Sequence, residues 1–204
     1  MKNTYASSLL PVALALALGV GPARAERADR AKPMNVEADA LRYDDLKQTS
    51  VFTGKVVVTK GTILIRGARM DVRQDPDGFQ YGVVTAEPGK LAFYRQKREG
   101  VDEYIEGEGE VIEYDGKADR VKFMKRAELR RFRGSTLGDE MSGNVITYDN
   151  TTDVFSVDGG PASAASPVAG GRVRAVLAPR GSASAPAQPG VPLRPSVTLD
   201  GGKK

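Results

Sequence analysis

The sequence predicts an all-β fold, and three observations point to it. Apolar and polar residues alternate along several short runs, most clearly in Val51–Val72. Turn sequences rich in Gly, Pro and Asp separate such runs at similar intervals, as in Gln74–Gly78, Glu87–Lys90 and Arg98–Gly100. After residue 25, no stretch carries the helical period of about 3.6 residues. Short strands separated by such turns are typical of a β-sandwich, a jelly roll or a barrel.

The first 25 residues have the features of a secretory signal peptide. Lys2 supplies a positive start, Leu9–Val20 is a short apolar run, and Ala23-Arg24-Ala25 has the small-x-small pattern of a cleavage site. The apolar run is shorter than the roughly 20 residues that a membrane-spanning helix needs. We therefore expect cleavage of residues 1–25 and a soluble, exported protein. Residues 26–32 are charged and lack periodicity, which predicts a flexible lead-in to a domain that begins at Pro33.

The composition describes one globular domain without the usual catalytic and metal-binding residues. The 204 residues are 40% hydrophobic and 27% charged, and they include no Cys and no His. Packing must therefore stabilise the exported protein without disulfides, and most hydrolase and zinc chemistries are excluded. Removal of residues 1–25 leaves 28 basic and 26 acidic residues, so the net charge gives little support to nucleic-acid binding.

Two strands joined by a tight turn form the clearest element of the chain. In Val51–Thr59 the apolar residues at even positions share one face of an extended strand. Lys60-Gly61 provides a reversal, after which alternation resumes in Ile63–Val72. Gly67 interrupts this second run, and a glycine within a strand pattern usually marks a bulge or bend. We therefore expect a curved antiparallel sheet.

A short regularity repeats along the chain. Tyr43-Asp44 lies nine residues before Phe52, and Tyr114-Asp115 lies nine residues before Phe123. Tyr148-Asp149 begins a third, shorter version. The repetition predicts hairpins stacked along one axis, and hence an elongated domain.

The C-terminal part changes character twice. Gly159–Gly171 consists of small residues and Pro, which predicts a flexible loop. Arg172–Ala178 has the pattern of a last strand, which Pro179 ends. Arg180–Lys204 has many prolines and few large apolar residues, so we expect a disordered tail.

Acidic residues form two candidate sites, each with a simpler interpretation. Paired carboxylates can bind hard cations or act as the acid and base of a glycosidase. Alternation on one strand, however, favours a solvated sheet face for the acidic run, and a plain turn explains Asp75 and Asp77. We assign no metal and no catalytic residue. The acidic run comprises Glu103, Glu106, Glu108, Glu110 and Glu113.

The basic run Arg120–Arg133 allows three interpretations. A solvated strand face is the first, and a rim of cations that binds the phosphates of an anionic amphiphile is the second. Nucleic-acid binding is the third, and the signal peptide argues against it.

Several motifs, in order, resemble the LptA/OstA-like family of lipopolysaccharide export proteins. They are Pro33–Asp39, Phe52–Ile63, Ala92–Tyr94, Gly138-Asp139, Ile146–Tyr148 and Arg172–Pro179. The resemblance implies an elongated, twisted, open β-jelly roll of short antiparallel strands with an apolar interior groove. It also implies a periplasmic carrier without a cofactor, which shields the acyl chains of lipid A. Its partners would be lipopolysaccharide, an LptC-like inner-membrane anchor and an LptD-like outer-membrane assembly protein.

Two departures from the family pattern concern the second half. Lys125-Arg126 stands where a pair like Gly54-Lys55 is expected, and Met141–Asn144 resembles an insertion.

The apolar positions of successive strands are the candidate lipid-binding residues. Their alternation is the same whether they pack against each other or line an open groove. The candidates are Met34, Val36, Phe52, Val56, Val58, Ile63, Ile65, Phe93, Phe123, Leu129 and Phe155.

The first and last strands of a stacked array have unpaired edges that can bind partners by β-augmentation. We expect Met34–Leu41 at one end and Arg172–Ala178 at the other, with head-to-tail self-association. The candidate edge residues are Asn35, Glu37, Val173, Ala175, Val176 and Leu177. An envelope adaptor that binds only proteins is an alternative function, and an enzyme that uses Asp/Glu or a Ser-Lys pair is a third.

Overall fold

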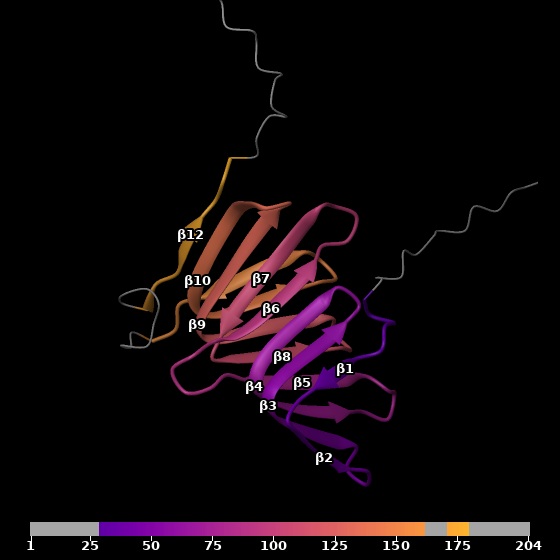
Figure 1. The fold of residues 1–204 in the computed structure, drawn as a ribbon. Helices are drawn as coiled ribbons and strands as arrows, with labels where there is room; N and C mark the ends of the chain where they lie inside the picture. Colours follow the sequence, from indigo (N-terminus) through magenta and orange to yellow (C-terminus); the bar gives the residue numbers. More distant parts are fainter. Residues whose placement is uncertain (1–28, 162–170, 180–204) are drawn as a thin grey trace, which may run out of the picture.

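The computed structural model describes residues 29–161 and 171–179 (Figure 1). The described part is built from antiparallel strands and contains no α-helix, so no helix there could cross a membrane. The predicted all-β class is confirmed. The predicted signal peptide, most of the predicted loop at 159–171 and the predicted tail lie outside the described residues.

The chain forms the strands β1 (Asn35–Glu37), β2 (Ala40–Asp44), β3 (Thr49–Lys60), β4 (Ile63–Gln74), β5 (Gln80–Thr85), β6 (Ala92–Lys97), β7 (Glu103–Gly109), β8 (Val111–Asp115), β9 (Arg120–Arg133), β10 (Thr136–Asp149), β11 (Val154–Asp158) and β12 (Arg174–Val176).

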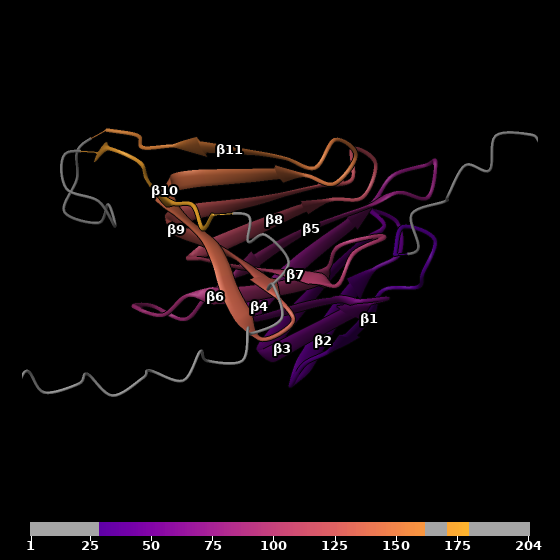
Figure 2. The same ribbon diagram turned by 90° about the horizontal axis from the view of Figure 1, so that it is seen from above.

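Four long strands, β3, β4, β9 and β10, are each shared between two faces of the sheet. One face has the order β2-β3-β4-β5-β8-β9-β10-β11, and the other has the order β1-β3-β4-β6-β7-β9-β10-β12. Figure 2 shows the two faces as layers, and the expected jelly roll is confirmed. Because side chains alternate across each strand, one side of both layers points into a common interior.

Irregular pairings bend the long strands where they pass from one face to the other. The register of β3 with β4 shifts between Thr53 and Val56, where Gly54 and Lys55 have φ of 80° and 45°. On β4 the buried positions change from Ile63 and Ile65 to Met70, so the bend predicted near Gly67 is confirmed. With the extra residue in β3, side chains of both strands face the interior on either side of the bend.

The same bend recurs in the second half of the chain. The register of β9 with β10 shifts between Gly143 and Val145, opposite Lys125 and Arg126, whose φ angles are 59° and 52°. Met141–Asn144, which resembles an insertion in the sequence, continues β10 through its bend.

The described strands form two repeats, β1–β6 and β7–β12. In each repeat, two short strands pair with the two halves of a long strand, as β1 and β2 do with β3, and β7 and β8 with β9. The next long strand then pairs with two more short strands, β5 and β6 or β11 and β12. The repeats join through the pairs β5–β8 and β6–β7. We call this connection the repeat junction.

Turn chemistry explains the recurring Tyr-Asp pairs. The carboxylates of Asp44, Asp115 and Asp149 accept hydrogen bonds from backbone N–H groups two or three residues onward. The fourth residue after each Asp has a positive φ, namely 50° at Gln48, 52° at Asp119 and 57° at Asp153. Each pair therefore ends a strand and begins a turn in which an Asx-type hydrogen bond holds the reversal.

Candidate functional site

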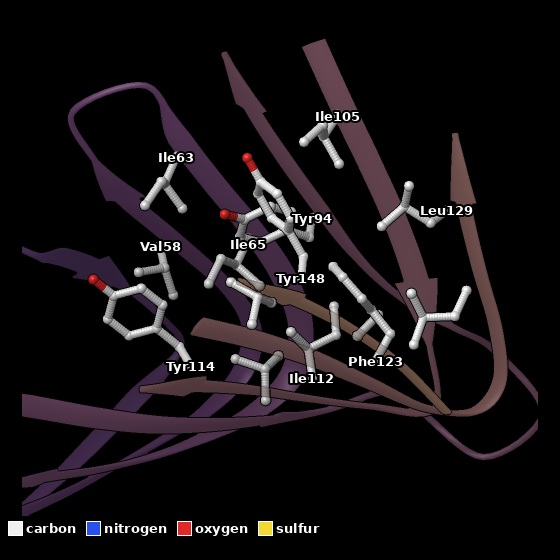
Figure 3. Packing of buried hydrophobic residues seen from close by; sticks show 14 of the residues in the cluster. Val58, Ile63, Ile65, Tyr94, Ile105, Ile112, Tyr114, Phe123, Leu129 and Tyr148 are labelled. Carbon is white, nitrogen blue, oxygen red and sulfur yellow. The ribbon is translucent and has the colours of Figure 1, made fainter. Parts of the chain in front are cut away.

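Most residues predicted to bind lipid face the interior between the two layers. Val56, Val58, Ile63, Ile65, Phe123 and Leu129 are buried in one apolar cluster, and Met34, Val36, Phe52 and Phe155 pack against its border. Figure 3 shows side chains from both halves of the chain meeting in this cluster. The structure thus brings together apolar residues from strands far apart in the sequence.

Phe93 is the exception, and its predicted place on the interior face is wrong. Its neighbours Ala92 and Tyr94 are each 0% exposed, whereas Phe93 is only half-buried. The Arg66 guanidinium lies 5.8 Å from the centre of the Phe93 ring. Because adjacent strand residues point to opposite faces, burial of Tyr94 places Phe93 on the outer face.

The interior is packed rather than open. The Tyr94 and Phe123 rings meet edge to face with centroids 5.5 Å apart, and the Tyr148 and Phe155 rings stack at 4.5 Å. Sequence reasoning missed much of this core, although period-2 alternation marks most of it. The buried residues outside the predicted lipid-binding set are Met70, Val84, Ala92, Tyr94, Ile105, Ile112, Tyr114, Val121, Ala127, Ile146 and Tyr148.

One side of the interior ends in a polar cavity of about 630 Å³ between the strand ends of the two layers. We call it the mouth. Thr62, Gln96 and Arg98 line it from one layer, and Tyr114 and Asp153 line it from the other. Its volume lies in the usual range of small-molecule sites, roughly 300–1,000 Å³.

Polar contacts around Asp153 connect the two layers at the mouth. Arg98 Nη2 lies 3.5 Å from Asp153 Oδ2, and the Tyr148 hydroxyl donates to Asp153 Oδ1 at 2.9 Å. Burial, followed by the hydrogen bond to Asp153, raises the pKa of Tyr148 well above its usual value. Arg98 also pairs with Glu103 on its own layer, and its Nε is buried without a partner in the described structure.

The segment before β1 also connects the layers. The Asp29 carboxylate accepts a hydrogen bond from the Thr62 N–H at 2.8 Å, and Arg30 Nη2 donates to the Lys117 carbonyl at 3.0 Å. Residues 29–32 therefore differ from the predicted flexible lead-in, because Asp29 caps the β3–β4 turn and holds the segment in place.

A buried polar group lies behind the mouth. Lys60 and Asp119 are 7% and 5% exposed, and Lys60 Nζ lies 5.5 Å from the Tyr114 ring centroid. Burial lowers the pKa of Lys60, and the Asp119 charge partly opposes this effect. Burial also raises the pKa of Tyr114 to about 12. Asn150 Nδ2 donates to Asp119 Oδ1 at 3.1 Å, so the inner end of the mouth is hydrogen-bonded.

The acidic and basic runs pair with each other on the outer face. Arg130 bonds to Glu108 at 3.0 Å and to Glu128 at 2.6 Å, and Arg126 pairs with Glu110 at 3.0 Å. Glu103 instead lies on the same side of β7 as the buried Ile105. Burial opposes ionisation of Glu103, yet hydrogen bonds from Arg133 and Arg98 outweigh it and lower the pKa of Glu103. The outer-face pairs agree with the first interpretation of both runs, a solvated face, and they leave few of these cations for a phosphate rim.

No group of three or more Asp or Glu residues within the described ranges could hold a metal ion. Asp75 instead accepts hydrogen bonds from the Phe79 N–H and the Tyr81 hydroxyl, and Asp77 pairs with Lys117 at 2.9 Å.

The two ends of the sheet carry the edge strands. Within the described ranges, β1 and β2 pair only with β3, and β11 and β12 pair only with β10. Figure 2 shows β11 and β12 on the side of the molecule opposite β1 and β2. The predicted edge residues Asn35, Glu37, Ala175 and Val176 lie in these strands, while Val173 and Leu177 flank β12.

Two features of these ends differ from the prediction. Met34–Leu41 is not one strand, because the chain turns at Asp39, whose N–H bonds to the Gly54 carbonyl at the bend of β3. In addition, β2 and β11 are edge strands that sequence reasoning did not identify. Exposed apolar side chains gather at both ends, including Leu41 at 59% and Leu177 at 68% exposure.

Comparison with known proteins gives consistent results. Residues 35–154 match the family described as LptA/(LptD N-terminal domain) LPS transport protein. Lipopolysaccharide export system protein LptH of Pseudomonas aeruginosa is 32% identical over 143 residues, which cover 70% of this chain and 78% of that protein. LptA of Escherichia coli K12 is 31% identical over 143 residues, 70% of this chain and 72% of that protein.

A solved structure has the same fold. The crystal structure of P. aeruginosa LptH, described as the LptA-homologous periplasmic component of a lipopolysaccharide transport device, superposes with a TM-score of 0.63 at 24% identity. The match covers 74% of this chain and 99% of that chain.

Proposed function

Because this chain belongs to the LptA and LptD N-terminal domain family of lipopolysaccharide transport proteins, we propose that it is a periplasmic, non-enzymatic carrier and bridge for lipopolysaccharide. In this proposal, the interior between the two layers shields the acyl chains of lipid A on the way from the inner to the outer membrane. The observation that carries the proposal is the continuous apolar interior, which runs through both repeats.

The energetics of such an interior suit acyl chains. Each buried CH₂ contributes about 0.8 kcal/mol, so an acyl chain of about ten carbons gains several kcal/mol on leaving water. On lipid entry, contacts among the apolar core side chains would be replaced by contacts with the acyl chain, which is also apolar. The main cost of opening is then the lost packing and the broken polar contacts at the mouth.

Those polar contacts are few and partly exposed. Asp153 is 52% exposed in its ion pair with Arg98, and pairs of this kind contribute roughly 0–1 kcal/mol. The opposite side of the interior is closed by the covalent chain, since β3, β4, β9 and β10 all continue through their bends. The layers therefore separate at the mouth at lower cost than at the bends.

The free edges suit the bridging role. Backbone donors and acceptors at β1–β2 and β11–β12 can add strands of a second copy, or of same-fold partners such as an LptC-like anchor and an LptD-like assembly protein. Two different edges make a contact that does not close on itself, so further copies can add head to tail.

Photo-crosslinking tests the lipid part. A photoreactive residue at Phe52 or Tyr94, which face the interior, should capture lipopolysaccharide, whereas one at Glu108 on the outer face should not. Similar labelling at all three positions would contradict an interior site. Mass spectrometry of the purified protein for bound lipid also distinguishes this proposal from the adaptor alternative, which requires partner binding without lipid.

Light scattering over a concentration series tests the edge part. We expect oligomers that persist after deletion of Arg180–Lys204 and are lost on deletion of Arg172–Ala178. Val176→Pro should weaken them, because proline disturbs strand pairing. A monomer at every concentration would contradict self-association and leave the lipid test unaffected.

A further inference from the structure

We infer that the repeat junction fixes the register of the contact between two copies of this chain. In that contact, β12 of one copy pairs with β1 of the next, and β11 pairs with β2. The inference rests on the proposed edge-to-edge association and adds the residues that meet.

The short strands of the two repeats are equivalent in pairs. β5 and β6 correspond to β11 and β12, because each pair lines the second long strand of its repeat. β7 and β8 correspond to β1 and β2, because each pair lines the first long strand. The chain therefore already contains one example of a repeat end joined to a repeat start, in β6–β7 and β5–β8.

The register follows from matching residues across the repeats. In the junction, Phe93 pairs with Glu108. Arg174 occupies the place of Phe93, since they pair with Ser142 and Arg66 at equivalent positions of β10 and β4. Glu37 occupies the place of Glu108, since it pairs with Val57 as Glu108 pairs with Glu128. The contact between copies therefore places Arg174 opposite Glu37 of the second copy.

The same matching applies to the other layer. In the junction, Val83 pairs with Glu113, and the corresponding pair between copies is Ser156 with Arg42. On the interior side, Gly82 pairs with Tyr114, so Phe155 would lie opposite Tyr43.

Side-chain chemistry at the two ends fits this register. Arg174 and Glu37 are both exposed and carry opposite charges, so they would form a cross-strand ion pair on the outer face. Tyr43 and Leu41 are 55% and 59% exposed, whereas their counterparts Tyr114 and Ile112, covered by β5, are 3% and 0% exposed. A second copy in this register would cover Tyr43 and Leu41 in the way that β5 covers Tyr114 and Ile112.

Engineered cysteines test the register without background, because the chain contains no cysteine. Chains with Glu37→Cys are mixed with chains with Arg174→Cys and oxidised, and heterodimers are quantified by non-reducing gel and mass spectrometry. Ser156→Cys with Arg42→Cys tests the other layer in the same way. Paired strand residues have Cα separations of roughly 4.5–5.5 Å, within the range that a disulfide requires.

Shifted pairs provide matched controls. Asn35→Cys with Arg174→Cys, and Ala40→Cys with Ser156→Cys, move one partner by two residues on the same strand face. Their diagonal separation of roughly 7–8 Å exceeds disulfide geometry, so we expect at least about tenfold less heterodimer. The inferred register would be overturned if shifted pairs gave more heterodimer than matched pairs. It would also be overturned if the matched pair of only one layer formed the disulfide.

A charge exchange tests the proposed ion pair. Glu37→Arg should weaken self-association about fivefold, and adding Arg174→Glu to the same chain should restore it. A double variant as weak as the single one would contradict the pair. If the wild-type chain does not self-associate at all, the edge proposal itself fails, whereas association without matched disulfides refutes only the register.

Discussion

The two repeats have one topology and differ in how well their cores are enclosed. Phe52 and Phe123 occupy equivalent places, since they pair with Met70 and Ile146 respectively, yet Phe123 is 0% exposed and Phe52 is only partly buried. The difference follows from the neighbouring strands: β7 and β8 are covered by β6 and β5, whereas β1 and β2 have an open edge in the described structure. Burial here is a property of position in the stack.

Truncation of the two phenylalanines should give the largest difference in stability between the two repeats. Phe123→Ala should cost about 4 kcal/mol, because it removes a fully buried ring that packs against Tyr94. Phe52→Ala should cost about 2 kcal/mol, because water already reaches part of that ring. Urea denaturation of both variants measures the difference. Equal losses would mean that the open edge leaves the first repeat as well packed as the second.

A glycine in the second repeat gives the next largest effect. An added Cβ at Gly107 would lie 2.3 Å from Phe123 Cε1, so Gly107→Ala should cost about 2 kcal/mol by overpacking. The equivalent residue in the first repeat is Val36, which already carries a side chain at the border of the core. Val36→Ala should cost less than about 1.5 kcal/mol. Thermal unfolding checks the order, and a larger loss from Val36→Ala would contradict it.

Substitutions at the two bends should change the free energy of unfolding in opposite directions. Lys125 adopts a positive φ that favours glycine, so Lys125→Gly should stabilise the protein by up to about 1 kcal/mol. Gly54→Ala should destabilise it by about 1–2 kcal/mol, because the Cβ would lie 2.3 Å from the Asp39 carboxylate. Lys55→Ala serves as a control without a new glycine. Destabilisation by Lys125→Gly would show that the lysine side chain, rather than its backbone, matters at this bend.

The smallest effect concerns acid stability at the third Tyr-Asp turn. Hydrogen bonds from Thr151, followed by that from Arg120, hold the pKa of Asp149 well below its usual 3.8. A lowered pKa stabilises the folded state at pH values above the usual pKa of the group. This contribution is lost as the pH falls below that usual pKa toward the lowered one. Wild type should therefore lose more stability than Asp149→Asn between about pH 5 and pH 2. Parallel slopes in denaturation across this range would contradict the prediction.

Local patterns predicted the strands and turns of this fold because their causes are local. Alternation in Val51–Val72 requires only neighbouring residues, and each Tyr-Asp pair carries its own turn chemistry. The bend at Gly67 was predictable for the same reason. Lys125-Arg126 forms the equivalent bend without glycine, and therefore the sequence alone suggested a departure from the family pattern.

The interior required information that the sequence does not carry locally. Ala92-Phe93-Tyr94 offers an aromatic residue to either face, so alternation cannot select the buried one. Pairing of β6 with β7 and with β4 decides it in favour of Tyr94. The polar contacts at the mouth were hidden for a related reason, because Arg98 and Asp153 are 55 residues apart in the chain and meet only when both layers form.

The paired charges on the outer face of β7 and β9 have a consequence for the rate of encounter between molecules. Opposite charges a few ångströms apart cancel each other at distances beyond the Debye length, which is about 8 Å at physiological ionic strength. This face therefore produces little long-range attraction or repulsion, and it neither steers nor repels an approaching copy. We therefore expect this face to contribute little to the salt dependence of the association rate constant.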